Sequence, residues 1–258
     1  MEFTKVRDLI DGVPHMRPPA GRKVYDFVLE NRCHNILELG TYHGVSTCYL
    51  AAAVDELGSG RVLTIDRRMA LRLDPTVLDL ARRTGLEHVI EARFAERSFT
   101  WELKKMLEAA EPEQFDFIFL DAGHVWDTTG FAFFLADRLL RPGGWLLFDD
   151  IEWTINGSSS VSEKSWAREY SEEERATKQI RSVVDLLVAT DPRYEVTIDG
   201  NWGWARKLAP AAPAPARVST SAVVGSVSSL VRDGRKTARR AARRARRELG
   251  KARARRTS

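Results

Sequence analysis

Residues 115–153, FDFIFLDAGHVWDTTGFAFFLADRLLRPGGWLLFDDIEW, decide the fold of this chain. The apolar run FDFIFL ends at Asp121, and the run WLLF ends at Asp149 and Asp150; a helical pattern and an RPGG turn lie between them. This order predicts two neighbouring parallel strands of an α/β sheet, whose carboxyl ends meet at one edge. We therefore expect the three carboxylates to gather where open α/β sheets bind ligands.

Three carboxylates at one sheet edge repel one another unless a cation joins them. Sets of ligands made only of oxygen suit Mg²⁺ or Ca²⁺. The pattern therefore predicts a divalent metal site formed by Asp121, Asp149 and Asp150. The structural alternatives are a strand-end carboxylate that caps a helix and a pair of acidic residues in a loop.

The alternation of strand and helix continues on both sides of this stretch. Buried-strand patterns occur at 35–39, 61–66 and 88–94, and helical patterns at 22–31, 45–57, 75–84 and 100–110. A polar stretch at 154–170 predicts a surface loop or lid, and a helical pattern at 172–190 precedes two strands joined by Gly-Asn. We predict a doubly wound, mostly parallel, seven-stranded sheet of the Rossmann-like type with an antiparallel edge strand.

The charge of the chain is segregated between its body and its tail. Beyond Leu208 lie 14 basic and two acidic residues, a net charge of +12, which leaves −8 for residues 1–208. We predict an N-terminal arm at 1–20, the α/β domain at 21–208, a Pro/Ala linker at 209–217 and a basic tail at 218–258, disordered or helical.

The tail predicts an anionic partner, for which a membrane surface, a nucleic acid, a glycan and the acidic body are the candidates. A solvated tail without a specific partner is the structural alternative. Two cysteines, no signal-peptide pattern and no apolar run of membrane-spanning length predict a cytoplasmic protein. Peripheral attachment to a membrane through the tail and assembly as a homodimer are left open.

A glycine-rich turn, ELGTYHG at 38–44, joins the first strand to its helix, and Asp66 ends the next strand. Glycines let a ligand approach the backbone, and a strand-end acid can bind ribose hydroxyls. Together with TIDR, FIFLDAGH and LRPGGWLLFDD, this turn resembles class I S-adenosylmethionine-dependent methyltransferases. Within that class the chain is similar to family 24 and to the metal-dependent catechol O-methyltransferase-like enzymes, over about residues 17–208.

The resemblance implies a set of residues that bind S-adenosyl-L-methionine. Glu38 and Gly40 would line its methionine part, Asp66 would hold the ribose, and Ala92 with Arg93 would lie at the adenine edge. The full implied set is Glu38, Gly40, Thr41, Gly44, Ser46, Asp66, Arg67, Ala92, Arg93 and Asp121.

The resemblance also implies a metal-assisted reaction, with Mg²⁺ as the expected ion at Asp121, Asp149 and Asp150. The catechol-type enzymes keep a lysine three residues after the first metal aspartate, and His124 stands at that position here. Histidine accepts a proton near neutral pH, so His124 is predicted as general base and, with Asp121, as a catalytic residue. A purely structural role for His124 is the alternative.

The implied activity is transfer of a methyl group to a hydroxyl of a small molecule or sugar, and Trp126 and Trp153 could wall the acceptor pocket. Two other functions are open. One is an RNA or protein methyltransferase that uses the basic tail, although DAGH lacks the Asn/Asp-Pro-Pro-aromatic turn of amino-group methyltransferases. The other is a non-methylating, cofactor-binding scaffold, because cephalosporin hydroxylase-like proteins have a related fold.

Overall fold

The structure is a computed structural model that describes residues 1–209. The predicted basic tail at 218–258, and all of the predicted linker except Ala209, lie outside the described residues.

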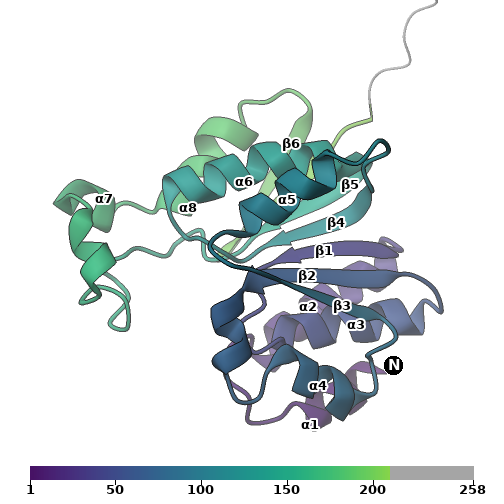
Figure 1. Cartoon of the computed structure of the whole chain (residues 1–258). Helices are drawn as coiled ribbons and strands as arrows, with labels where there is room; N and C mark the ends of the chain where they lie inside the picture. Colours follow the sequence, from purple (N-terminus) through teal and green to yellow (C-terminus); the bar gives the residue numbers. More distant parts are fainter. Residues whose placement is uncertain (210–258) are drawn as a thin grey trace, which may run out of the picture. The chain divides into compact units, whose positions relative to one another are not determined.

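A seven-stranded sheet with the strand order β3-β2-β1-β4-β5-β7-β6 forms the centre of the domain (Figure 1). All strand pairs are parallel except those of β7, which runs antiparallel to β5 on one side and to β6 on the other. The strands are β1 (Asn35–Leu39), β2 (Arg61–Arg67), β3 (Ile90–Ala95), β4 (Phe115–Leu120), β5 (Leu140–Phe148), β6 (Tyr194–Asp199) and β7 (Trp202–Lys207). This arrangement confirms the predicted seven-stranded, doubly wound fold.

Helices cover both faces of the sheet, which is why the central strands are apolar at successive positions rather than alternating. One face is covered by α2 (Pro18–Glu30), α3 (Val45–Glu56) and α4 (Val77–Thr84), and α1 (Phe3–Leu9) packs on these helices. The other packs against α5 (Phe99–Leu107), α6 (Trp126–Leu139) and α8 (Gln179–Val183), followed by the π-helical turn η3 (Val184–Val188). A 3₁₀ turn, η1 (Arg68–Arg72), follows β2.

The first 20 residues differ from the predicted arm because their first helix belongs to the core. Phe3, Val6 and Ile10 are buried, and the Phe3 ring stacks on Tyr49 of α3 at 5.2 Å between centroids. The amino group of Met1 also forms an ion pair of 2.8 Å with Asp55. The spacing of the three apolar residues fits one face of a helix. The Pro-Pro pair at 18–19 favours extended chain, and for that reason the sequence predicted an arm.

Three predicted helices have clearly different bounds in the structure. The helix expected at 22–31 begins four residues earlier, at Pro18. The helix expected at 100–110 spans Phe99–Leu107, and the Ser98 side chain caps its amino end. The helix expected at 172–190 is broken after α7 (Glu172–Ala176), where Thr177 is extended with a ψ of 139°. The chain then turns back into α8, so that α8 packs against α6.

The predicted polar lid at 154–170 has a small core of its own. Ile155 and Ala167 are buried against Val125, and Trp153, Val161 and Tyr170 pack around them. A 3₁₀ turn, η2 (Ser165–Glu169), lies within this segment. The segment therefore packs on a small core of its own, and this core includes Val125, the residue directly after His124.

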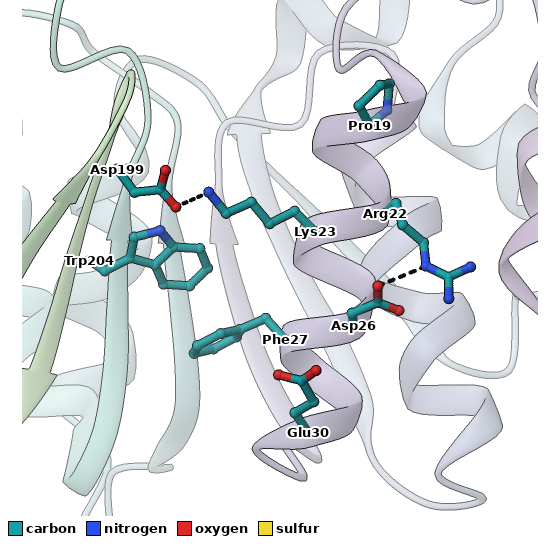
Figure 2. Close-up of a pocket in the computed structure, with 8 residues that line it drawn as sticks. All are labelled: Pro19, Arg22, Lys23, Asp26, Phe27, Glu30, Asp199 and Trp204. Atoms are coloured by element: carbon teal, nitrogen blue, oxygen red, sulfur yellow. Dashed lines mark hydrogen bonds and ion pairs between the residues drawn. The ribbon is translucent and has the colours of Figure 1, made fainter.

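Among the described residues, none of the helices is long and apolar enough to cross a membrane. A surface hollow of about 490 Å³ lies between α2 and the hairpin of β6 and β7 (Figure 2). Ion pairs of Lys23 with Asp199 and of Arg22 with Asp26 lie on its walls. Its lining is Pro19, Arg22, Lys23, Asp26, Phe27, Glu30, Asp199 and Trp204, which includes none of the predicted site residues.

Candidate active site at the carboxyl edge of the sheet

The glycine turn between β1 and α3 lies against the end of β4. Gly40 has a φ of +99°, and a Cβ added to it would lie 2.0 Å from the carbonyl oxygen of Asp121. Gly44 has a φ of +92°, and a Cβ there would overlap Val77 of α4. Only glycine fits both positions, because an L side chain would be strained in conformation and would clash. The turn thereby brings its backbone directly to Asp121.

Glu38 is fully buried beneath this turn. Its carboxylate accepts hydrogen bonds from Ser46, at 2.6 Å, and from Thr47, both in the first turn of α3. Burial raises the pKa of Glu38 to about 7, although the two hydroxyl groups oppose the shift. In the structure Glu38 and Ser46 hold the start of α3 to β1, and both side chains are buried.

Asp66, predicted to bind ribose, orders the same turn. Its Oδ2 accepts hydrogen bonds from the backbone amides of Thr41 and Tyr42 at 2.9 and 2.8 Å, and its Oδ1 accepts one from the amide of Arg67 at 2.6 Å. The Thr41 hydroxyl lies within hydrogen-bond distance of the Thr64 hydroxyl. A carboxylate oxygen has two lone pairs, so Asp66 can hold the turn and still accept a ligand hydroxyl.

The remaining predicted cofactor residues lie along β2 and β3. Arg67 is exposed at the end of β2. Ala92 and Arg93 lie inside β3, paired with Thr64 and Ile65, and Arg93 forms an ion pair of 2.6 Å with Glu91. The strand ends later, at Ala95. The predicted adenine-edge residues are therefore two to three positions upstream of the strand end.

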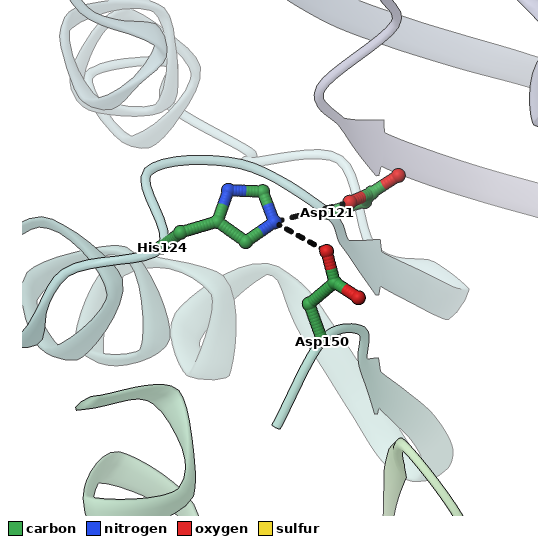
Figure 3. Close-up of side chains that lie close together, drawn as sticks. All are labelled: Asp121, His124 and Asp150. Atoms are coloured by element: carbon green, nitrogen blue, oxygen red, sulfur yellow. Dashed lines mark ion pairs between the residues drawn. The ribbon is translucent and has the colours of Figure 1, made fainter. Parts of the chain in front are cut away.

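Asp121, His124 and Asp150 come together beside the glycine turn (Figure 3). Nε2 of His124 lies 3.5 Å from Oδ1 of Asp121 and 3.3 Å from Oδ2 of Asp150. The structure thus confirms that residues after β4 and β5 meet at one edge. It adds His124 to the cluster, between the two carboxylates.

The backbone at this cluster is held in an uncommon conformation. His124 and Asp150 have φ angles of 49° and 56°, in the left-handed region that non-glycine residues rarely adopt. Nε2 of His124 is buried and makes no hydrogen bond within residues 1–209, since neither carboxylate meets it with hydrogen-bond geometry. Two carboxylates and a buried nitrogen that makes no hydrogen bond form a set of donor atoms that suits a cation when the imidazole is neutral.

The pKa values of Asp121, His124 and Asp150 depend on one another. Burial lowers the pKa of His124, but its contacts with Asp121 and Asp150 outweigh burial and raise that pKa to about 10. The contact with His124 in turn lowers the pKa of Asp150, whereas burial raises the pKa of Asp121. This rise in pKa favours the protonated form of His124, a form that cannot accept a proton as a general base would.

Asp149 lies apart from the three clustered side chains. Its Oδ1 accepts hydrogen bonds of 2.7 Å from Nε1 of Trp202 in β7 and from the amide of Asp150. Burial, together with the charges of Asp121 and Asp150, raises the pKa of Asp149 to about 7. In this structure Asp149 anchors the end of β5 to β7, and it does not share the cation-binding geometry of its neighbour.

The profile of a family described as "Methyltransferase domain", family 24, matches residues 37–151, which contain the glycine turn, Asp66 and all the clustered side chains. Residues 37–151 are a methyltransferase domain. The match confirms the predicted family, and no curated protein matches the chain significantly in sequence.

Several solved structures share the fold of this methyltransferase. An O-methyltransferase from Bacillus cereus, in complex with S-adenosylhomocysteine, aligns with a TM-score of 0.58 and 22% identity over 80% of this chain and 92% of that chain. The O-methyltransferase TomG from Streptomyces achromogenes, involved in tomaymycin synthesis and in complex with S-adenosylmethionine, aligns at 0.57 and 19% over 80% and 89%. A putative caffeoyl-CoA O-methyltransferase from Staphylococcus aureus aligns at 0.57 and 19% over 80% and 92%.

Three contacts of the methyltransferase site were not anticipated from the sequence. Asn201, in the β6–β7 turn, donates a hydrogen bond of 2.7 Å to Oδ1 of Asp150, and Trp202 binds Asp149. His15 packs edge-on against Tyr42 of the glycine turn at 4.2 Å, and its charge also lowers the pKa of Asp150. In the sequence, the pair Gly200-Asn201 indicates only a turn, because Asp150, the hydrogen-bond partner of Asn201, lies 51 residues away.

The two tryptophans predicted to wall the acceptor pocket differ in position. The ring of Trp153 lies 5.4 Å from that of His124 and packs on the small core of the lid. Trp126 begins α6 and is 41% exposed. Trp153 therefore borders the cluster directly, whereas Trp126 has an exposed ring at the start of α6.

Proposed function

We propose that this enzyme transfers the methyl group of S-adenosylmethionine to a hydroxyl of a small molecule or sugar, assisted by a divalent ion. One observation carries the proposal: the backbone of Gly40 lies against Asp121, so the glycine turn and the carboxylate cluster share one edge of the sheet. A methyl donor on the turn would stand beside an acceptor at the cluster. The S-adenosylmethionine and S-adenosylhomocysteine complexes of the similar structures support the same cofactor.

The residues of the chain would contribute mainly position and exclusion of water. Methyl transfer from a sulfonium to an oxyanion cancels charge, so correct alignment of the two reactants is the largest requirement. Asp66 orders the turn through two of its amides, and Trp153, whose ring lies beside His124, would shield the acceptor from water. A divalent ion held by Asp121 and Asp150 would lower the pKa of the acceptor hydroxyl.

The test is a screen of hydroxyl acceptors that follows formation of S-adenosylhomocysteine, with and without added divalent ions. Calorimetry with S-adenosylmethionine should show binding to the full chain. The double variant Asp121→Asn/Asp150→Asn should lose about 100-fold or more in turnover, whereas Asp185→Asn, which changes an exposed carboxylate on η3, should match the wild type.

Two results would count against the proposal. An absence of binding heat at high concentrations of S-adenosylmethionine contradicts the cofactor, and unchanged turnover in a chelator contradicts the role of the ion. Including RNA and protein acceptors in the screen, with a variant ending at Ala209, tests the alternative that the basic tail delivers a macromolecule. Three further predictions from the sequence remain proposals: an anionic partner for the basic tail, assembly as a homodimer and a cytoplasmic location.

A further inference from the structure

The imidazole of His124 points its Nε2 at the carboxylates of Asp121 and Asp150 (Figure 3). Its Nε2 is buried and lacks a hydrogen-bond partner within the described part of the chain. Buried polar nitrogens almost always make a hydrogen bond, whereas this atom meets Asp121 and Asp150 only as ion-pair contacts of 3.5 and 3.3 Å. A cation between the ring and the carboxylates would engage all three side chains.

The three side chains have the geometry of a preformed ion site. One donor atom from each of Asp121, His124 and Asp150 can be chosen so that all lie within 4.8 Å of one another. Two neighbouring ligand atoms on one ion, each at about 2.1 Å, lie roughly 3 Å apart. The observed separations of 3.5 and 3.3 Å from Nε2 need only a small contraction to reach that value.

The kind of donor atom selects the kind of ion. Mg²⁺ and Ca²⁺ prefer oxygen alone, whereas an imidazole nitrogen favours first-row transition ions. We propose that Asp121, His124 and Asp150 together bind one transition ion of the Fe²⁺, Co²⁺, Ni²⁺ and Zn²⁺ group, with His124 as the ligand that shifts selectivity away from Mg²⁺. This inference rests on the proposed function only in that both use the same divalent-ion site.

Two consequences separate this arrangement from a site made of three aspartates. Asp149 is outside the ligand set, because the donor atoms that lie within 4.8 Å of one another come from Asp121, His124 and Asp150, and its own Oδ1 is held by Trp202. The lone pair of Nε2 that binds the ion cannot also accept a proton from the acceptor. His124 is therefore a ligand and not the general base predicted from the sequence.

The experiment measures ion binding to the full chain, freed of metal by a chelator and then dialysed. Affinities for Co²⁺, Zn²⁺ and Mg²⁺ are measured for the wild type and for His124→Asn, which replaces the imidazole by an oxygen donor. We expect His124→Asn to weaken Co²⁺ and Zn²⁺ binding on the order of 100-fold while Mg²⁺ binding changes by less than about threefold. His88→Asn, a change at an exposed histidine paired with Asp55, should leave all three affinities unchanged.

A second measurement identifies the ligand atoms in the wild-type chain before any variant is compared. Electron spin echo spectroscopy of the wild-type chain loaded with Cu²⁺ should show coupling to an imidazole nitrogen. Visible absorption of the Co²⁺ form should lack thiolate charge-transfer bands, because the two cysteines, Cys33 and Cys48, are buried elsewhere. Nitrogen coupling that persists in His124→Asn would assign the ion to another histidine and overturn the inference.

The remaining outcomes also decide the matter. Unchanged Co²⁺ affinity in His124→Asn, or no transition ion bound at millimolar concentration, would mean that protonated His124 is itself the cation between the carboxylates. Transition-ion binding through His124 without any methyl transfer would refute the proposed function and leave this inference standing. Methyl transfer that is supported by Mg²⁺ and unaffected by His124→Asn would refute this inference and leave the proposed function standing.

Discussion

The indole Nε1 of Trp202 donates a hydrogen bond of 2.7 Å to Oδ1 of Asp149, and this bond joins the start of β7 to the end of β5. This contact decides which of two adjacent carboxylates is free. Asp149 is held against β7, and Asp150, one residue later, turns toward His124. The site therefore depends on β7, which follows the glycine turn by about 160 residues.

Trp202→Phe should lower the free energy of unfolding by about 1–3 kcal/mol, because it removes one of the two hydrogen-bond donors of the buried Asp149 carboxylate. The loss should grow as pH rises through about 7, where Asp149 becomes ionised in the folded protein. Chemical denaturation at pH 6 and pH 8.5 checks both points. Trp101→Phe, at an exposed position, is the matched control, and equal losses for the two variants would contradict the role of the hydrogen bond.

Glu38 should make the protein less stable as pH increases from about 4.5 to 7. Its folded pKa, about 7, is above the ordinary value of 4.5, so the unfolded chain releases this proton first. By linkage the folded state loses stability across that window, by on the order of 2–3 kcal/mol for a fully buried group. Glu38→Gln should flatten this part of the pH profile relative to the wild type.

The exposed change Glu87→Gln serves as the control for Glu38, and its pH profile should follow that of the wild type. Denaturation midpoints at half-unit pH intervals give both profiles. If Glu38→Gln and the wild type run parallel between pH 4.5 and 7, the buried carboxyl group is not the source of the pH dependence.

Gly40→Ala should disrupt the junction of the glycine turn and the carboxylate cluster, because its Cβ would overlap the carbonyl oxygen of Asp121. Gly58→Ala is a sharp control: Gly58 also has a positive φ, +77°, but a Cβ there meets nothing within 4 Å. The control should cost about 1–2 kcal/mol from backbone conformation alone. Gly40→Ala should cost several kcal/mol more by denaturation, and comparable costs would show that the turn can move away from β4.

A chain ending at Ala209 should keep the cooperative thermal transition of the full chain, with a midpoint within about 3 °C. Residues up to 208 complete the domain, since the amide of Leu208 still donates a hydrogen bond of 2.7 Å to the carbonyl of Arg193. A chain ending at Arg193 loses β6 and β7 and should show no such transition. Calorimetry of the two truncated chains makes the comparison, and a missing transition in the first would show that the tail is needed for folding.

Much of the site could be predicted because it follows from local pattern and strand order. Apolar runs that end in Asp121 and Asp149-Asp150, separated by one helix, require parallel neighbours and a shared carboxyl edge. The glycines of the turn announce a close backbone approach, which the structure shows between Gly40 and Asp121. The positions of Ala92 and Arg93 were less well predicted, because the end of β3 depends on its pairing with β2.

The sequence by itself determined the order of strands and helices, the edge at which the carboxylates lie, and the family of the methyltransferase domain. Only the tertiary structure decided that Asp150 and His124, rather than Asp149, join Asp121. Periodicity fixes the side of the sheet on which a strand residue lies, but it does not extend past the strand end. There, a left-handed Asp150 and a hydrogen bond from Trp202, 53 residues away, set the directions of the two carboxylates.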